Sequence, residues 1–117
     1  MKVLVYGASE NPERYAYKAA QLLKEHHHEL VLVGNREGSL FGNPIHKEKV
    51  FDEVDTVTLY VGPKNQTELS AYLKELKPRR VIFNPGTENP LLEKELEQEG
   101  ILVEEACTLV LLHTGQF

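Results

Sequence analysis

The chain has 117 residues, 41% of them hydrophobic and 26% charged, which predicts a single globular domain over residues 1–117 and excludes a disordered, collagen-like or disulfide-scaffold protein. Thirteen Lys and Arg against eighteen Asp and Glu give a formal net charge of −5, which argues against nucleic acid or an anionic membrane surface as a partner. One cysteine, no signal-peptide pattern after Met1 and no apolar run near the ~20 residues of a membrane span lead us to expect a cytoplasmic protein.

The first third of the chain predicts a strand, a helix and a second strand. Residues 2–6 form an apolar, β-branched run that ends at Gly7 and is too short for a helix. Asn11 followed by Pro12 predicts a helix start, because the Asn side chain can accept an unpaired N–H and Pro loses no hydrogen bond there. The apolar stripe of this helix consists of Tyr15, Ala16, Ala19, Ala20, Leu22 and Leu23. Residues 30–33 then form the second strand, which implies parallel pairing.

The rest of the chain repeats this alternation. Apolar runs at 56–61, 80–83 and 101–103 predict three further strands. Residues 65–68 are typical of a helix N-terminus, as is Asn89 followed by Pro90, and Leu92 and Leu96 mark the inner face of the second of these helices. Residues 108–112 predict a last apolar segment against the sheet, and residues 37–55 have no clear period and stay unassigned. We therefore predict an α/β fold, a Rossmann-like doubly wound parallel five-stranded sheet with helices on both faces.

The turn after the first strand is the first candidate ligand site. In a doubly wound sheet, ligands bind at the carboxyl ends of the strands, where the strand order reverses. Residues 7–12 place small residues and a helix N-terminus there, and such a turn attracts phosphate through its N–H groups and the helix dipole. The alternative interpretation is that the turn only allows close packing of the helix.

The same region argues against NAD. The turn has one glycine where the dinucleotide fingerprint G-x-G-x-x-G has three, and Arg36 follows the second strand where NAD proteins usually carry an acid. An arginine there suits a ligand with an extra ribose phosphate, as in NADP or coenzyme A. A solvated surface arginine is the alternative.

Catalytic and metal-binding candidates are few. Cys107 and His113 are the only obvious nucleophile and base, but a Cys beside an apolar run is more typical of core packing. The adjacent histidines 26–28 point in different directions from one helix turn, so they do not suit a single metal ion. Glu104 and Glu105 are typical of a solvated strand end. We therefore expect no catalytic residue and no metal ligand.

Three blocks of sequence resemble the small stand-alone CoA-binding proteins, whose single domain is similar to the nucleotide-binding domain of the succinyl-CoA synthetase α subunit. The blocks are residues 7–15 (GASENPERY), 60–66 (YVGPKNQ) and 81–90 (VIFNPGTENP), in the expected order. The chain departs from many members at His27, where they carry glycine, and at Gly34-Asn35, where they carry Asn-Pro.

The resemblance implies a site for CoA or an acyl-CoA built from three loops. Residues 7–9 and Arg14 would lie near the pyrophosphate, Asn35 and Arg36 near the adenosine 3′-phosphate, Pro63 and Lys64 at the nucleotide edge, and residues 86–88 along the pantetheine arm. The candidate binding residues are Gly7, Ala8, Ser9, Asn11, Arg14, Gly34, Asn35, Arg36, Pro63, Lys64, Gly86 and Thr87.

Three functions stay open on the sequence. The first is a non-catalytic or regulatory module that binds CoA or an acyl-CoA as its small-molecule nucleotide ligand. The second is an enzyme, either an NADP-dependent reductase or an acyl transferase that uses Cys107. The third is a homodimeric regulatory protein without CoA dependence, assembled through the apolar tail 108–117 and its exposed Phe117.

Overall fold

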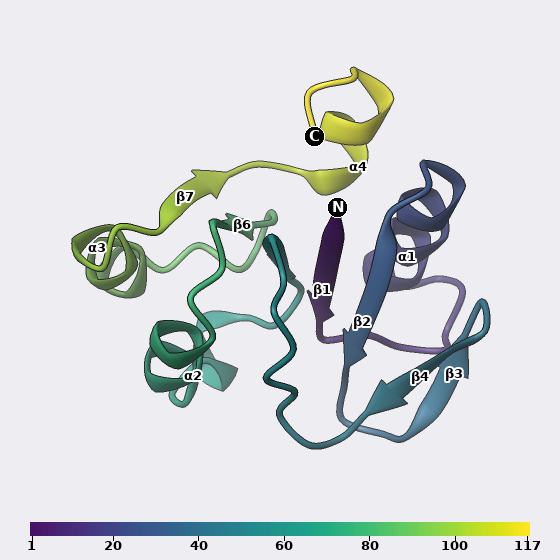
Figure 1. The fold of residues 1–117 in the computed structure, drawn as a ribbon, viewed down its shortest axis with the longest axis horizontal. Helices are drawn as coiled ribbons and strands as arrows, with labels where there is room; N and C mark the ends of the chain where they lie inside the picture. The colour runs from purple at the N-terminus through teal and green to yellow at the C-terminus, as the bar shows by residue number, and fades with distance from the viewer.

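Seven strands form one sheet in the computed structural model, which describes residues 1–117. The strands are β1 (Lys2–Tyr6), β2 (Glu29–Val33), β3 (Gly38–Leu40), β4 (Asn43–His46), β5 (Thr56–Leu59), β6 (Arg80–Phe83) and β7 (Leu102–Glu105). Their order across the sheet is β3-β4-β2-β1-β5-β6-β7, which runs from right to left in Figure 1. All neighbours pair in parallel except β3 and β4. The prediction of a doubly wound, mainly parallel sheet is therefore confirmed.

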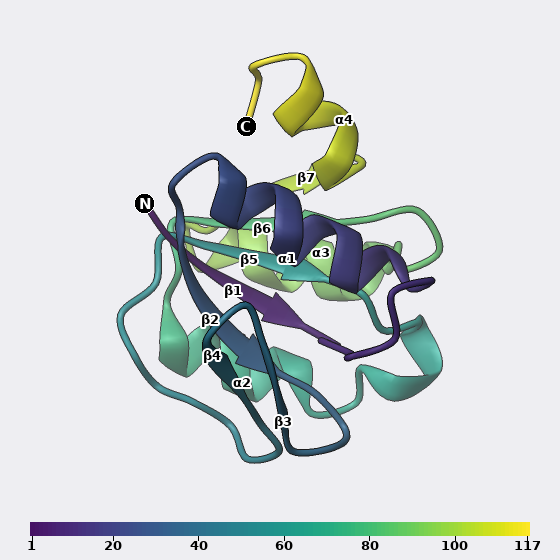
Figure 2. The same ribbon diagram turned by 90° about the vertical axis from the view of Figure 1, so that its right-hand side faces the viewer.

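Helices cover both faces of this sheet. They are α1 (Tyr15–Glu25), α2 (Leu69–Leu76), α3 (Pro90–Gln98) and α4 (Thr108–His113), and a 3₁₀ helix, η1 (Pro63–Asn65), precedes α2. Helices α1 and α4 contribute to one buried cluster and α2 and α3 to the other, and Figure 2 shows α1 above the central strands and α2 below them. The longest helix, α1, has 11 residues, and no helix has the length and apolar character needed to cross a bilayer.

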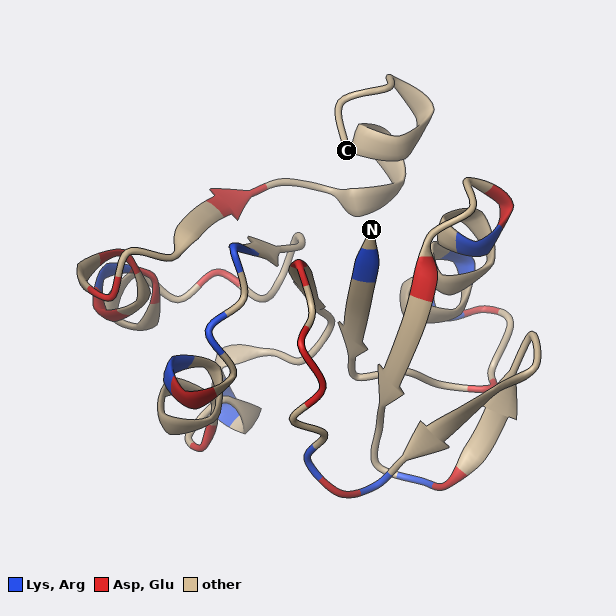
Figure 3. Cartoon of the chain, viewed as in Figure 1, with Lys and Arg blue, Asp and Glu red and all other residues tan.

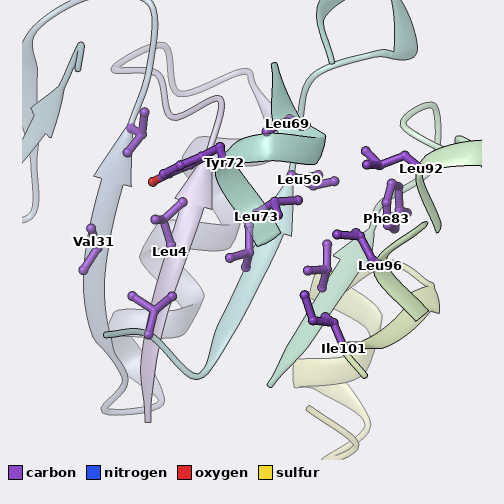
Figure 4. Packing of buried hydrophobic residues seen from close by; sticks show 14 residues of the cluster. Leu4, Val31, Leu59, Leu69, Tyr72, Leu73, Phe83, Leu92, Leu96 and Ile101 are labelled. Atoms are coloured by element: carbon purple, nitrogen blue, oxygen red, sulfur yellow. The ribbon is translucent and has the colours of Figure 1, made fainter. Parts of the chain in front are cut away.

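Two hydrophobic cores result, one on each face. Alternate residues of β1 supply both, since Val3 and Val5 face α1 and Leu4 faces α2. Figure 4 shows the core between the sheet and helices α2 and α3, with Leu73 of α2 near Leu4 and Leu96 of α3 beside Phe83 of β6. Burying a side chain of this size stabilises the fold by about 1.5–3 kcal/mol. The two cores hold the strand ends in fixed positions.

The sheet has two strands more than predicted, because residues 38–46 form a hairpin. Its two-residue turn consists of Phe41 and Gly42, which both have positive φ angles, 50° and 83°. Asn-Gly or Asp-Gly usually marks such a turn, and Phe41 does not. Pro44 lies inside β4, and a proline in the sequence normally argues against a strand, so this strand was not predicted.

Two predicted helix starts are wrong. Helix α1 begins at Tyr15 and not at Pro12, because the Asn11 side chain accepts from the N–H of Glu13 (3.0 Å) and stabilises a turn before the helix. Helix α2 begins at Leu69, with no side-chain cap from residues 65–68.

The predicted start at Asn89 and Pro90 is confirmed. The Asn89 side chain accepts from the N–H of Leu92 (3.2 Å), and Pro90 is the first residue of α3. Leu92 and Leu96 form its buried face, as predicted. The last apolar segment folds as α4, which buries Thr108 and Leu112.

The end of α1 is a Schellman motif with a histidine in the usual glycine position. The N–H of His28 donates to the carbonyl of Leu23, and the N–H of His27 to that of Lys24, both at 3.0 Å. His27 has a φ of 66°, in the left-handed region that glycine favours. This conformation explains why glycine suits the position.

The predicted exposure of Phe117 is wrong, because its ring packs on the chain itself. The guanidinium of Arg80 lies 4.6 Å from the ring centroid, and Arg80 Nη2 donates to the main-chain oxygen of Phe117 at 3.0 Å. The ring of His28 lies 5.1 Å away on another side. Phe117 therefore offers no exposed ring to a homodimer, whereas Val110 of the same tail is 54% exposed.

Candidate functional site

A groove opens at the carboxyl ends of the parallel strands, where the strand order reverses. The chain leaves β1 through α1 to reach β2 on one side, and β5 pairs with β1 on the other. Loops that follow these strands meet above the gap, which is the usual ligand position in such sheets. The space has two adjoining parts that share part of their lining, a main groove of about 910 Å³ and a side hollow of about 720 Å³. Both parts include Gly7, Asn35, Val61 and Asn65.

The structure brings most of the predicted binding residues together in this space. The main groove is lined by Gly7, Ala8, Ser9, Asn11, Arg14, Asn35, Arg36, Gly86 and Thr87. The side hollow adds Gly34 and Lys64. Pro63 lines neither part, and its side chain lies exposed at the first position of η1.

The N–H groups available to an anion lie beyond the first two residues of the β1–α1 loop. The N–H groups of Gly7 and Ala8 both donate to the carbonyl of Val33, at 2.8 and 2.9 Å. Those of Ser9 and Glu10 have no acceptor in the protein, and neither have those of Tyr15 and Ala16 at the start of α1. Gly7 and Ala8 therefore shape the turn, while the next residues and the helix start present free donors.

Two glycines allow the loops to approach each other. Gly7 has a φ of 100°, and a Cβ there would lie 3.1 Å from the main-chain carbon and oxygen of Tyr60. A Cβ on Gly34 would lie 2.3 Å from the carbonyl oxygen of Ala8. Only glycine therefore fits at the crossing of the loops that follow β1 and β2.

The main groove carries two arginines without an ion pair. Arg14 lies exposed at the N-cap of α1, and neither Glu10 nor Glu13 forms a salt bridge with it. Glu10 instead accepts from the N–H of Ser39 at 3.1 Å, which fastens the loop to β3. Arg36, after β2, is exposed and also unpaired. A cation beside a helix N-terminus opposes the dipole, so an anion between them would be favourable.

Gln66 joins the two loops on the other side of the groove. Its Nε2 donates to the carbonyls of Val61 (2.9 Å) and Thr87 (2.8 Å), and its Oε1 accepts from Asn89 Nδ2 (2.8 Å). The Thr87 hydroxyl donates to the carbonyl of Asn84, so it is committed within the protein. Sequence reasoning missed Gln66, because its place between two helix-start residues resembles a cap and carries no sign of burial.

A buried polar cluster lies under the groove beside Tyr60. Asn84 Nδ2 donates to the Thr58 hydroxyl (2.6 Å), and Asn84 Oδ1 accepts from the N–H of Thr108 (2.8 Å), which fastens α4 to the sheet. Tyr60 lines the main groove, and burial raises its pKa to about 12. The phenol is therefore protonated at neutral pH and can donate a hydrogen bond.

The structure does not assemble the candidate catalytic pair. Cys107 is half-buried at the N-cap of α4, His113 lies exposed in the last turn of the same helix, and no hydrogen bond joins them. Nowhere does the chain gather three or more His, Cys, Asp or Glu side chains as metal ligands.

Several lining residues escaped the sequence analysis. Tyr60 was assigned to the interior of a strand that in fact ends at Leu59. Lys47 and Phe51 belong to the unassigned segment, and only the pairing of β4 with β2 carries them to the groove. The exposed Tyr15 was assigned to the apolar helix face.

Comparisons with known proteins give one family and a consistent fold. The model of the CoA binding domain family matches residues 1–113. The crystal structure of an uncharacterized protein is 50% identical, with a TM-score of 0.96 over 99% of this chain and 97% of that chain. A protein from Thermus thermophilus is 25% identical, with a TM-score of 0.88 over 99% and 90%.

A hypothetical protein from Pyrococcus horikoshii OT3 is 24% identical, with a TM-score of 0.85 over 98% of this chain and 82% of that chain, and at this identity it shows the fold alone. No curated protein matches the chain.

Proposed function

Because the chain belongs to the CoA binding domain family, we propose that its groove binds coenzyme A or an acyl-CoA, as a non-catalytic or regulatory module. The observation that supports this most is the convergence of loops after β1, β2, β5 and β6 on two adjoining spaces that share part of their lining. These spaces offer free N–H groups and unpaired cations, which are the groups that phosphates require.

The pyrophosphate fits the β1–α1 loop best. Residues 9–10 and 15–16, whose N–H groups have no acceptor in the protein, line this end of the main groove, and Arg14 adds a positive charge beside them. From there the main groove continues to Gly86, on the loop after β6, where an extended pantetheine arm has room. Asn35 and Arg36, which follow β2, line the same groove.

Nothing in the groove resembles a complete catalytic centre. Cys107 does not line either part of the space, and the protonated phenol of Tyr60 is a hydrogen-bond donor at neutral pH. The groups that line the groove are suited to hold and orient an anionic ligand.

Titration calorimetry with CoA, dephospho-CoA, NADP and NAD tests the proposal. We expect CoA to bind most tightly, and Arg14→Ala to weaken it by about tenfold or more, because a charge-assisted contact contributes roughly 1.5–3 kcal/mol. Lys24→Ala removes an exposed cation from the far end of the same helix and should leave the affinity unchanged. No heat with any of the four ligands would refute the proposal, and equal affinities of Arg14→Ala and the parent would remove Arg14 from the site.

A further inference from the structure

We propose that the side hollow binds the adenosine end of CoA, with Lys47 and Lys64 holding the 3′-phosphate and Phe51 packing against the adenine. This inference rests on the proposed function and names the residues that would make the site specific for CoA over dephospho-CoA. It moves the 3′-phosphate away from Arg36, where the family resemblance places it.

The first argument is the branching of the space. The side hollow adjoins the main groove over Gly7 and Asn35, beside the β1–α1 loop. CoA has two arms that leave its pyrophosphate in different directions. With the pyrophosphate at residues 9–15, the main groove toward Gly86 can take the pantetheine arm, and the side hollow remains for the nucleoside. A volume of about 720 Å³ is within the usual range of small-molecule pockets.

The second argument is charge. Three lysines line the side hollow, but Lys49 is committed, because its Nζ lies 3.2 Å from Glu68 Oε2. Lys47 and Lys64 are exposed and form no ion pair. Glu48 also lines the hollow and is the acid there that no lysine neutralises. In Figure 3 the loops that follow β2 and β4 carry blue residues at the end of the sheet toward which the strands point.

Arg36 differs from these lysines in position. It lines the main groove and not the side hollow, whereas its neighbour Asn35 lines both. A 3′-phosphate on a nucleoside inside the side hollow would therefore meet Lys47 and Lys64 before Arg36. Two ammonium groups match the charge of a phosphate monoester, which carries close to two negative charges at neutral pH.

The third argument is the exposed aromatic ring on the wall of the hollow. Phe51 is 54% exposed, so about half of its surface is open to solvent. Its ring meets Tyr72 edge to face, with centroids 5.3 Å apart, and this contact fixes its position while the rest of the ring stays free. A flat apolar surface beside two free cations suits a purine nucleotide.

Calorimetry with CoA and dephospho-CoA tests the inference on Lys47→Met, Lys64→Met and Arg36→Gln. Lys94→Met, an exposed and unpaired lysine on α3, is the matched control. We expect the parent to bind CoA more tightly than dephospho-CoA. Each of the two lysine substitutions should weaken CoA by about tenfold and leave dephospho-CoA unchanged. Phe51→Ser should weaken both ligands by about fivefold or more and leave their ratio unchanged.

The outcomes separate this inference from the proposed function. Absence of CoA binding by the parent would overturn the proposed function itself. CoA binding with the preference lost in Arg36→Gln and kept in both lysine variants would overturn the inference alone. Equal affinity of the parent for CoA and dephospho-CoA would also overturn it, because no residue would then contact the 3′-phosphate. The lysines are exposed, so thermal melts should show unchanged folding of their variants.

Discussion

Replacing Gly34 by alanine should disturb the crossing of the two loops that form the groove. The new Cβ would lie 2.3 Å from the carbonyl oxygen of Ala8, whereas ordinary contacts begin at 3.4 Å, so the loop would have to retreat by about 1 Å. That loop is fastened by the N–H groups of Gly7 and Ala8, which donate to Val33 at 2.8 and 2.9 Å. Overpacking of this kind costs about 1–3 kcal/mol, and weakening a hydrogen bond adds up to about 1 kcal/mol. We expect the free energy of unfolding to fall by about 2–3 kcal/mol.

Urea unfolding of the variant and a matched control measures this cost. Gly62→Ala makes the same substitution in the β5–η1 loop, where the nearest atom to a new Cβ is the oxygen of Gly86 at 3.8 Å. With no overlap there, alanine should be neutral or stabilise by about 0.4–1 kcal/mol through the unfolded chain. The displaced loop should also weaken CoA binding in Gly34→Ala, because it carries the free N–H groups of Ser9 and Glu10. Stabilities of the two variants within about 0.5 kcal/mol of each other would refute the reasoning.

Two further predictions concern stability. His27→Gly should raise the free energy of unfolding by about 0.5–1 kcal/mol, because His27 holds a φ of 66° at the end of α1; His27→Ala keeps the Cβ and should bring no gain in the same urea titration, and a loss of stability with glycine would contradict the account. Burial, together with the neighbouring carboxylate of Glu105, raises the pKa of Glu93 above its ordinary 4.5. The folded chain therefore binds more protons than the unfolded chain just above that pH, and the free energy of unfolding falls as the pH rises through this range. Glu105→Gln should therefore stabilise by a few tenths of a kcal/mol at pH 7 and by less near pH 3.5, whereas Glu53→Gln, at an exposed acid without an ion pair, should not; an equal gain at both pH values would argue against the coupling.

The strands were predictable where burial on both faces leaves a continuous apolar run. Residues 30–33 and 81–83 lie within such strands, and the structure buries every residue of both runs. The hairpin at 38–46 was not predictable, because its turn uses Phe41 where an asparagine or aspartate would have signalled it. The start of α1 was misplaced because the Asn11 oxygen has a local alternative, the N–H of Glu13, within a turn. Where a side chain can form its hydrogen bond in either of two local structures, the sequence alone does not show which of them forms.

The loops of the candidate site could be found because they follow strands, but their connections could not. A strand end predicts that a loop reaches the carboxyl edge of the sheet, and this places residues such as Ser9 and Gly86. Lys47 reaches the same edge only because β4 pairs in parallel with β2, with Val33 opposite His46. The role of Gln66 depends on two carbonyls that come from different loops. Long-range strand pairing places Lys47 in the site, and burial between two loops places Gln66 there. Neither cause leaves a pattern in the nearby sequence.

The two ends of the sheet differ in whether their cationic side chains have acidic partners, and this contrast supports an anionic ligand. At the amino ends of the strands, Arg79 pairs with Asp55, and the buried Arg80 contacts Glu104 and the ring of Phe117. At the carboxyl ends, the groove is lined by cations without a partner, namely Arg14, Arg36, Lys47 and Lys64. A chain with a formal net charge of −5 repels a polyanion at long range, so binding must rely on charges placed at short range. Unpaired cations collected beside free N–H groups supply such a local attraction, and this fold positions them through loops that the two cores hold in place.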